Sequence, residues 1–202
     1  QCYDTFTGFK FLAEKKDKLE GAGEGKVVFS YEESYGYMLG DFVRDKDAVT
    51  ASLALTEMAA YYASKGMTVL DALNALYEKH GYYGEKTHNL VMPGLDGLKD
   101  MAKLMASLRQ TPPREIAGVT VRQFKDYQDG SVVDCATGET SAMELSGSNV
   151  LRFELADGTS IIVRPSGTEP KIKVYVLTKG KDAAERDANL AKYASWVAEL
   201  KP

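Results

Sequence analysis

The chain has 202 residues, of which 44% are hydrophobic and 27% charged, a composition that allows a substantial core and excludes a disordered chain. Its formal net charge of −4 argues against nucleic acid as a partner, because binding to the phosphate backbone requires a basic surface. No apolar run approaches the roughly 20 residues of a membrane helix, and the cysteines have neither metal-ligand nor CxxC spacing. We therefore expect a cytoplasmic protein with no membrane partner and no metal site of its own.

The first half is predicted to form part of an α/β domain. The segment KVVFS at 26–30 is apolar like a strand and ends at the polar cluster YEESYGY. Apolar residues then recur every three to four positions over 48–62 and again over 70–77, after a capping box that starts at Thr68, which predicts two helices with inward-facing stripes. One strand is too little sheet for two helices to cover. Because structured sequence also begins at Gln1, we expect a fragment of a larger domain.

The second half is predicted to form an α+β domain. A helix with apolar residues on one side precedes the paired prolines of RQTPPRE, which end it; these apolar residues are Leu98, Met101, Met105 and Leu108. Strand-like segments follow, with an Asp157-Gly158 turn typical of a tight hairpin. Asp182 caps a final helix. This order predicts an antiparallel sheet with helices on one face.

The loop RPSGTEPK lies between the last two predicted strands. Ser166 and Thr168 offer hydroxyl donors, and Gly167 lets the backbone turn its N–H groups toward a ligand. Arg164 provides a planar fork for bidentate phosphate contact, and Lys171 adds a point charge. These residues suit a phosphate cradle. An ordinary polar hairpin loop with a surface arginine suits them equally well.

A second polar segment follows the first predicted strand. Glu32, Glu33 and Ser34 can accept hydrogen bonds from neighbouring hydroxyls of a sugar, and loops at strand ends commonly carry function. Arg44 and Lys46 can balance a phosphate or take part in acid–base chemistry. Taken alone, these residues favour a plainer interpretation, an acidic turn followed by a charged helix start.

A third segment, TGFKF, lies near the first residue. Thr7 and Gly8 form a turn, and Lys10 is a cation between aromatic residues, a pattern that a surface lysine also produces. Considered together and in this order, TGFKF, EES with RDKD, and RPSGTEPK resemble the α-D-phosphohexomutase superfamily. The greatest similarity is to the phosphoglucomutases, with the phosphomannomutases and phosphopentomutases close by.

The resemblance implies a four-domain enzyme of which this chain supplies the C-terminal half. Residues 1–84 would be the later part of domain three, an incomplete α/β domain that carries the sugar-binding loop. Residues 85–202 would be domain four, an α+β fold of the TBP-like kind that carries the phosphate-binding loop. The missing N-terminal domains would then be partners of this chain.

The resemblance also implies a role for each matching residue. The sugar and the reacting end of the substrate would contact Thr7, Gly8, Lys10, Glu32, Glu33, Ser34 and Arg44. Lys46 would be the candidate for proton transfer. The phosphate that is not being transferred would be held by Arg164, Ser166, Gly167 and Thr168, with Lys171 as a weaker addition.

Two motifs of the superfamily have no match in this sequence. One is the loop of the phosphorylated serine, since Thr50-Ala51-Ser52 falls within a helical stripe. The other is the Asp-Gly-Asp-x-Asp-Arg loop that binds metal. Phosphoryl transfer relies on a metal ion and a nucleophile in line, so we expect this chain to recognise a sugar phosphate without converting it.

The whole enzyme would be an isomerase, an intramolecular phosphotransferase that interconverts glucose 1-phosphate and glucose 6-phosphate. Its reaction would pass through a phosphoserine and glucose 1,6-bisphosphate, with Mg²⁺ bound by residues outside this chain. Three alternatives stay open: a phosphomannomutase or phosphopentomutase, a non-catalytic module that binds sugar phosphates, and a structural α+β domain with incidental loops.

Overall fold

The structure is a computed structural model that describes residues 1–33, 35–40, 42–94, 96–167 and 169–200. Its contacts divide the chain into two compact units, Gln1–Ala75 and Leu76–Pro202. The domain boundary expected at residues 84 and 85 stays a prediction. No helix in the described ranges is both long enough and apolar enough to cross a membrane.

The first unit combines helices with a two-stranded antiparallel sheet. In chain order its elements are α1 (Phe9–Gly21), β1 (Phe29–Glu32), β2 (Gly36–Leu39), α2 (Ala48–Ala63) and α3 (Val69–His80), which continues into the second unit. The side chain of Asp47 accepts a hydrogen bond from the Val49 amide at 2.9 Å and so caps α2. The predicted capping box of α3 is confirmed, because Asp71 accepts from the Thr68 amide at 2.8 Å and Thr68 accepts from the Asp71 amide at 3.1 Å.

The apolar stripes predicted on α2 and α3 are not buried within the described residues. Helix α2 has no buried residue, and Ala72 is the buried residue of α3. Leu55 and Leu70, both expected to point inward, are 55% and 64% exposed. The prediction of a buried stripe is wrong for these helices because the β1–β2 hairpin offers too small a sheet for both of them to cover.

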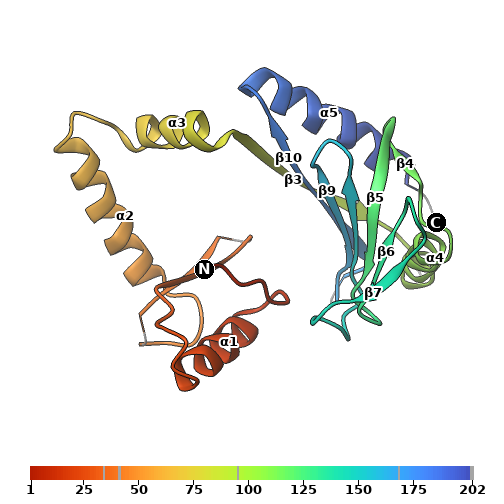
Figure 1. The fold of residues 1–202 in the computed structure, drawn as a ribbon, viewed down its shortest axis with the longest axis horizontal. Helices are drawn as coiled ribbons and strands as arrows, with labels where there is room; N and C mark the ends of the chain where they lie inside the picture. Colours follow the sequence, from red (N-terminus) through yellow and green to blue (C-terminus); the bar gives the residue numbers. More distant parts are fainter. Residues whose placement is uncertain (34, 41, 95, 168, 201–202) are drawn as a thin grey trace. The chain divides into compact units, whose positions relative to one another are not determined.

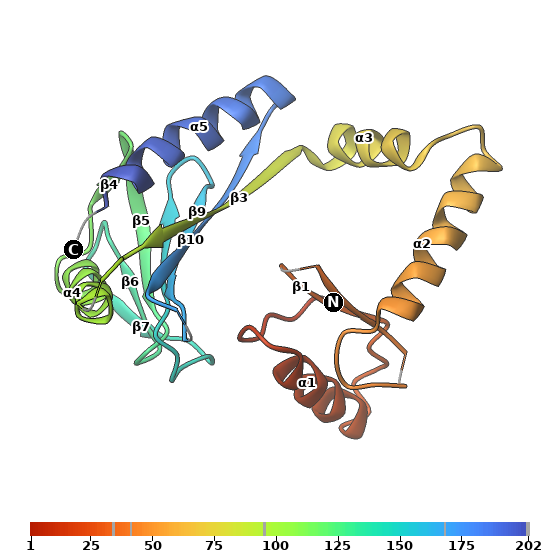
Figure 2. The ribbon, with the colours of Figure 1, turned by 180° about the vertical axis from the view of Figure 1, so that it is seen from behind.

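The second unit is an antiparallel sheet with helices, as predicted, and the sheet has eight strands. Its elements are β3 (Tyr82–Val91), α4 (Gly97–Gln110), β4 (Glu115–Ile116), β5 (Val119–Asp126), β6 (Ser131–Asp134), β7 (Thr140–Ala142), β8 (Leu151–Leu155), β9 (Ser160–Pro165), β10 (Lys171–Gly180) and α5 (Ala183–Glu199). The sheet order is β3-β10-β9-β8-β5-β6-β7, with β4 on β5, and every pairing is antiparallel. Figures 1 and 2 show α4 and α5 on the same face of this sheet.

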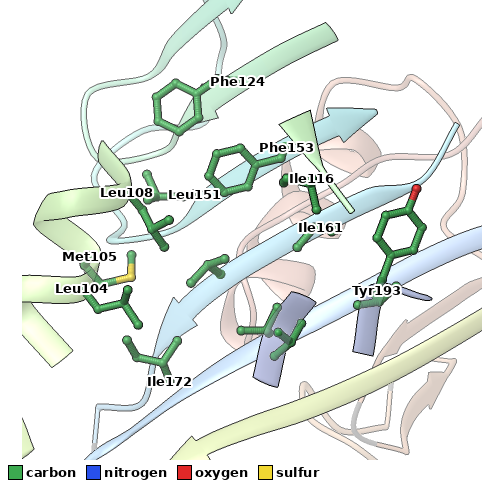
Figure 3. Close-up of a cluster of buried hydrophobic side chains, with 14 of the residues drawn as sticks. Leu104, Met105, Leu108, Ile116, Phe124, Leu151, Phe153, Ile161, Ile172 and Tyr193 are labelled. Carbon is green, nitrogen blue, oxygen red and sulfur yellow. The ribbon is translucent and has the colours of Figure 1, made fainter. Parts of the chain in front are cut away.

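Alternate residues of the strands point to one side of the sheet and form the core of the second unit. Ile172, Val174 and Val176 of β10 are fully buried, whereas the residues between them are half-buried, the pattern of a strand with one covered face. These side chains belong to one cluster with buried residues of α4 and α5, and Figure 3 shows Ile172 beside Leu104 of α4. The core residues labelled there are Leu104, Met105, Leu108, Ile116, Phe124, Leu151, Phe153, Ile161, Ile172 and Tyr193.

One expected core residue of α4 lies outside. Leu98 is 68% exposed, while Met101, Leu104, Met105 and Leu108 are buried. At about 3.6 residues per turn, Leu98 falls on the edge of the stripe that the buried residues define. Leu104, which was not among the predicted residues, is part of the buried face instead.

The predicted Asp157-Gly158 turn is confirmed and is fastened to α5. Gly158 has a φ of 82°, which favours glycine. The Asp157 side chain accepts a hydrogen bond from the Thr159 amide at 2.9 Å and another from the Tyr193 hydroxyl. The β8–β9 hairpin is therefore tied to the last helix by a buried tyrosine.

Two leucines of α4 give a matched test of this core. Leu104→Ala removes a side chain that is 3% exposed and should lower the free energy of unfolding by about 2–5 kcal/mol. Leu98→Ala, the same change on the exposed side of the same helix, should alter it by less than about 0.5 kcal/mol. Urea unfolding followed by circular dichroism measures both, and equal effects would contradict the described face of α4.

Candidate functional site

The segment RPSGTEPK runs from the last two residues of β9 to the first residue of β10 in the second unit. The backbone closes it, because the Ser166 amide donates to the Lys171 carbonyl at 2.8 Å and the Lys171 amide donates to the Glu169 carbonyl at 2.7 Å. The Glu169 amide also donates to the Ser166 hydroxyl at 3.3 Å. Thr168 lies outside the described residues, so its predicted role stays a prediction.

A neighbouring segment supports the same loop from the side. The Met92 amide, just after β3, donates to the Pro170 carbonyl at 2.9 Å. Gly97, the first residue of α4, fits closely against both: a Cβ there would lie 2.1 Å from the Met92 carbonyl oxygen and 3.1 Å from Pro170 Cβ. The C-terminal end of the loop is thus held by the connection between β3 and α4.

Arg164 is the residue of this loop with an unsatisfied buried donor. Its Nε atom is buried and has no hydrogen-bond acceptor among the described residues, an uncommon condition that costs free energy. Arg164 pairs directly with Lys173 across the β9–β10 ladder, so the two side chains leave the same face of the sheet. Sequence reasoning missed Lys173, although the alternation of β10 already placed it on the face away from the core.

Gly167 and Lys171 contribute less than their residue types suggested. Gly167 does not have a positive φ, and a Cβ built on it would meet no atom within 4 Å. Neither the backbone conformation nor the neighbouring atoms therefore require a glycine at position 167. The Lys171 ammonium forms an ion pair with the Glu169 carboxylate, which offsets part of its charge.

In the first unit, the predicted motifs meet at the Phe9 ring. Phe9 belongs to the TGFKF segment and is 3% exposed. The Lys46 ammonium lies 5.1 Å from the centre of its ring, a cation–π geometry. A Cβ on Gly36 would lie 2.7 Å from Phe9 Cε2 and 2.9 Å from Glu32 Oε1. The segments TGFKF, EESYG and RDKD are therefore brought together around one buried aromatic side chain.

The charges around Lys46 keep it protonated. Its Nζ atom is 2.8 Å from Asp45 Oδ1, and that hydrogen bond raises the pKa of Lys46, aided by the charges of Asp45 and Glu32. The same contact lowers the pKa of Asp45. A lysine carries its proton at neutral pH, and the raised pKa holds that proton more tightly, so Lys46 in this arrangement is a cation that can stabilise an anion.

The other predicted residues of the first unit do not all join this cluster. Arg44 forms an ion pair with Asp17 of α1, with Nη1 and Oδ2 2.6 Å apart. Lys10 lies over the Phe11 ring, 4.8 Å from its centre, as a surface lysine often does. Gly8 precedes α1 with a φ of 125°, which explains the glycine.

The structure adds little about three further predicted site residues. Thr7 and Glu33 are exposed, and Ser34 lies outside the described residues. Phe9 and Gly36 were not assigned a role from the sequence. Their position inside the motifs TGFKF and YEESYGY was the sequence signal that could have identified Phe9 and Gly36.

Metal-binding side chains do not gather in the described part of the chain. It offers no group of three or more His, Cys, Asp or Glu side chains that can hold a metal ion. Mg²⁺ is held by oxygen ligands, usually one or two carboxylates together with phosphate oxygens and water. Within the described ranges, the side chains therefore do not form a ready site for the Mg²⁺ ion that the resemblance implies.

Comparison with known proteins gives consistent matches along the chain. Residues 1–80 match the family model described as phosphoglucomutase/phosphomannomutase, alpha/beta/alpha domain III, and residues 89–190 match the C-terminal domain of the same family. A phosphoglucomutase of Staphylococcus aureus strain N315 is 37% identical over 179 residues, and that of bovine strain RF122 is 38% identical over 176. These alignments cover 89% and 87% of this chain but only 32% and 31% of the relatives.

A solved structure shows the same fold. The open form of the Paramecium exocytosis-sensitive phosphoprotein pp63/parafusin, a phosphoglucomutase, matches with a TM-score of 0.57 and 20% identity. The match covers 95% of this chain and 31% of that protein. The chain thus spans about a third of the length of the relatives it matches.

The pairing of Lys46 with Asp45 is open to direct measurement. Asp45→Asn removes the hydrogen-bonded carboxylate and should lower the pKa of Lys46 toward its ordinary value, because the raised pKa comes mainly from that contact. An NMR titration of the labelled lysine side chain measures the shift. Asp47→Asn is the control: it removes the neighbouring carboxylate that caps α2 and should leave the pKa of Lys46 unchanged. Equal shifts in both variants would contradict the pairing.

Proposed function

The chain belongs to the phosphoglucomutase/phosphomannomutase family, and on that premise we propose that it binds the substrate of a phosphoglucomutase-type isomerase. The phosphate-binding part is assigned to Arg164, Ser166, Gly167 and Thr168, with Lys171 as a minor contributor. The observation that carries the proposal is the buried Nε of Arg164 without an acceptor among the described residues. A guanidinium fixed in this way suits bidentate contact with a phosphate.

Charge at this position supports the assignment. Arg164 and Lys173 are paired neighbours on one face of the sheet, and two adjacent cations repel each other unless an anion approaches both. The loop's own backbone is closed by its internal hydrogen bonds, so little conformational entropy is lost when a ligand binds. Both properties suit a phosphate better than they suit a simple connector.

The hydroxyl-binding part is assigned to the loop at 32–34 in the first unit. The Glu32 side chain lies close to Gly36, with Oε1 2.9 Å from the position that a Cβ on Gly36 would take. A carboxylate accepts hydrogen bonds from adjacent hydroxyls of a sugar. Thr7, Gly8, Lys10 and Arg44 are assigned to the surroundings of the same bound sugar.

Lys46 is assigned to proton transfer as an acid. When a phosphoryl group leaves a sugar oxygen, that oxygen must gain a proton. The Lys46 ammonium carries one at neutral pH, as lysine does, and the hydrogen bond to Asp45, with the charges of Asp45 and Glu32, raises its pKa and holds that proton more tightly. To accept a proton in the reverse direction, Lys46 would first have to lose its contact with Asp45.

The proposed reaction of the whole enzyme explains why two kinds of loop are needed. A phosphoserine gives its phosphoryl group to a sugar hydroxyl, forming glucose 1,6-bisphosphate, and the other phosphoryl group then returns to the serine. The bisphosphate must change its orientation between these two steps. The phosphate loop therefore has to accept either phosphate, and the hydroxyl loop has to bind hydroxyls in both orientations.

The sequence of this chain contains neither the serine loop nor the metal loop of the superfamily. Mg²⁺, when bound, would neutralise charge on the transferring phosphate, and its ligands are assigned to sequence outside this chain. We accordingly propose that the chain by itself binds glucose phosphates and does not interconvert them.

Arg164 provides the test of the phosphate assignment. Arg164→Ala should weaken binding of glucose 1-phosphate to the chain by about 1.5–3 kcal/mol, because a charged hydrogen bond is lost. Isothermal titration calorimetry measures the affinity. Arg122→Ala, which removes an exposed arginine from β5 of the same sheet, should leave it unchanged. Equal losses in the two variants would show a nonspecific charge effect, and no loss in either would reject the phosphate site.

A further inference from the structure

The tip of the β1–β2 hairpin presents an aromatic side chain in an unfavourable backbone conformation. Glu32 pairs with Gly36 at the end of the ladder, so three residues connect the two strands. Hairpin loops of this length usually need a left-handed residue at their third position, where glycine or asparagine fits best. Tyr35 has this position, with a φ of 61°, a conformation that bulky side chains rarely adopt.

Among the described residues, the surroundings of the Tyr35 side chain do not offset this backbone strain. It is 90% exposed, and no ring contact or hydrogen bond is found for it among the described residues. Neighbouring aromatic residues of the same hairpin behave differently, because the Phe29 ring stacks with Tyr31 at 5.5 Å and with Tyr37 at 6.0 Å between ring centres. Tyr35 therefore combines a strained backbone conformation with an aromatic ring that is exposed to solvent.

The residue that follows explains why the loop cannot simply shift by one position. Gly36 packs on Phe9 and Glu32 so closely that a Cβ would clash with both. The glycine is thus required where it is, at the base of the hairpin, and the strained position falls on Tyr35. Strain of this kind is found where a side chain has a function.

We propose that the Tyr35 ring covers one face of the bound sugar. This inference rests on the proposed hydroxyl-binding role of the same loop and adds a residue to it. The C–H groups of a sugar ring carry partial positive charge and pack well against the negative face of an aromatic ring. Glu32 and Glu33 beside it would bind the hydroxyls at the edge of the sugar. A tyrosine offers this flat contact at a small cost in side-chain entropy.

The proposal predicts opposite effects on stability and on binding. Tyr35→Asn places a residue that tolerates the left-handed conformation and should raise the unfolding temperature by roughly 4–8 °C. The same variant should bind glucose 1-phosphate about 3- to 10-fold more weakly, because the ring contact is lost. Tyr35→Phe keeps the ring and should change neither quantity appreciably.

Ala117 provides the matched control. It is the other non-glycine residue with a positive φ, 49°, in the described chain, and it lies between β4 and β5 in the second unit. Ala117→Asn should also raise the unfolding temperature but should leave the affinity for glucose 1-phosphate unchanged. Unchanged affinity in Tyr35→Asn would overturn the proposal and leave Tyr35 as a strained surface residue.

NMR of the tyrosine rings separates this inference from the proposed function. The Tyr35 signals are those that disappear in Tyr35→Phe, and the wild-type chain is titrated with glucose 1-phosphate and, separately, with inorganic phosphate. The proposal expects glucose 1-phosphate to shift the Tyr35 ring signals and inorganic phosphate to leave them in place. Ring signals that stay in place with both ligands would overturn it. Amide signals of the 164–171 loop report on the phosphate site independently: a lack of response there counts against the proposed function, while Tyr35 is still judged by its own signals.

Discussion

Strand β10 is hydrogen-bonded along both of its edges, and the second unit depends on this pairing. On one side it pairs with β3 from Lys171 to Gly180, and on the other with β9 from Ile172 to Leu177. Its alternate residues enter the core beneath α4 and α5. The RPSGTEPK loop connects β9 to β10, so the position of Arg164 is fixed by the same ladder that builds the core. A loop on such a base holds its cations in place before any ligand arrives.

The first unit is organised on a smaller scale, around the Phe9 ring. Gly36 of the EESYG segment packs against that ring, and Lys46 of the RDKD segment lies over it. These contacts bring the separate motifs into one local arrangement. Helices α2 and α3 keep much of their apolar surface exposed within the described residues. Order at the candidate site thus comes from a few close contacts and not from a large core, and glycine at position 36 is the condition for those contacts.

Much of this could be predicted from the sequence, because the signals were local. The alternation of β10, the capping box at Thr68 and the Asp157-Gly158 turn each follow from spacing and residue type, and each is confirmed. The family and its fold followed from the three motifs and are confirmed by the matches over residues 1–80 and 89–190. The burial of Leu55 and Leu70 was predicted wrongly, since periodicity shows that a helix has an apolar face but not whether a sheet is present to cover it.

The features missed from the sequence depend on contacts between distant residues. Phe9 meets Lys46 only because α1 and the RDKD segment come together, and Lys173 faces Arg164 only in the register of β9 and β10. The strain at Tyr35 depends on the ladder ending at Glu32 and Gly36. The roles of the individual site residues stay predictions, including those of Ser34 and Thr168, which lie outside the described residues.

We propose above all that this chain binds a glucose phosphate and does not convert it. A single ³¹P NMR experiment tests both parts: the chain is mixed with glucose 1-phosphate and Mg²⁺, and the spectrum is followed over several hours. We expect the glucose 1-phosphate signal to shift or broaden as protein is added, and we expect no glucose 6-phosphate signal to appear. A glucose 1-phosphate signal that the protein leaves unchanged would contradict the binding claim, and growth of a glucose 6-phosphate signal would contradict the claim that the chain lacks the catalytic groups.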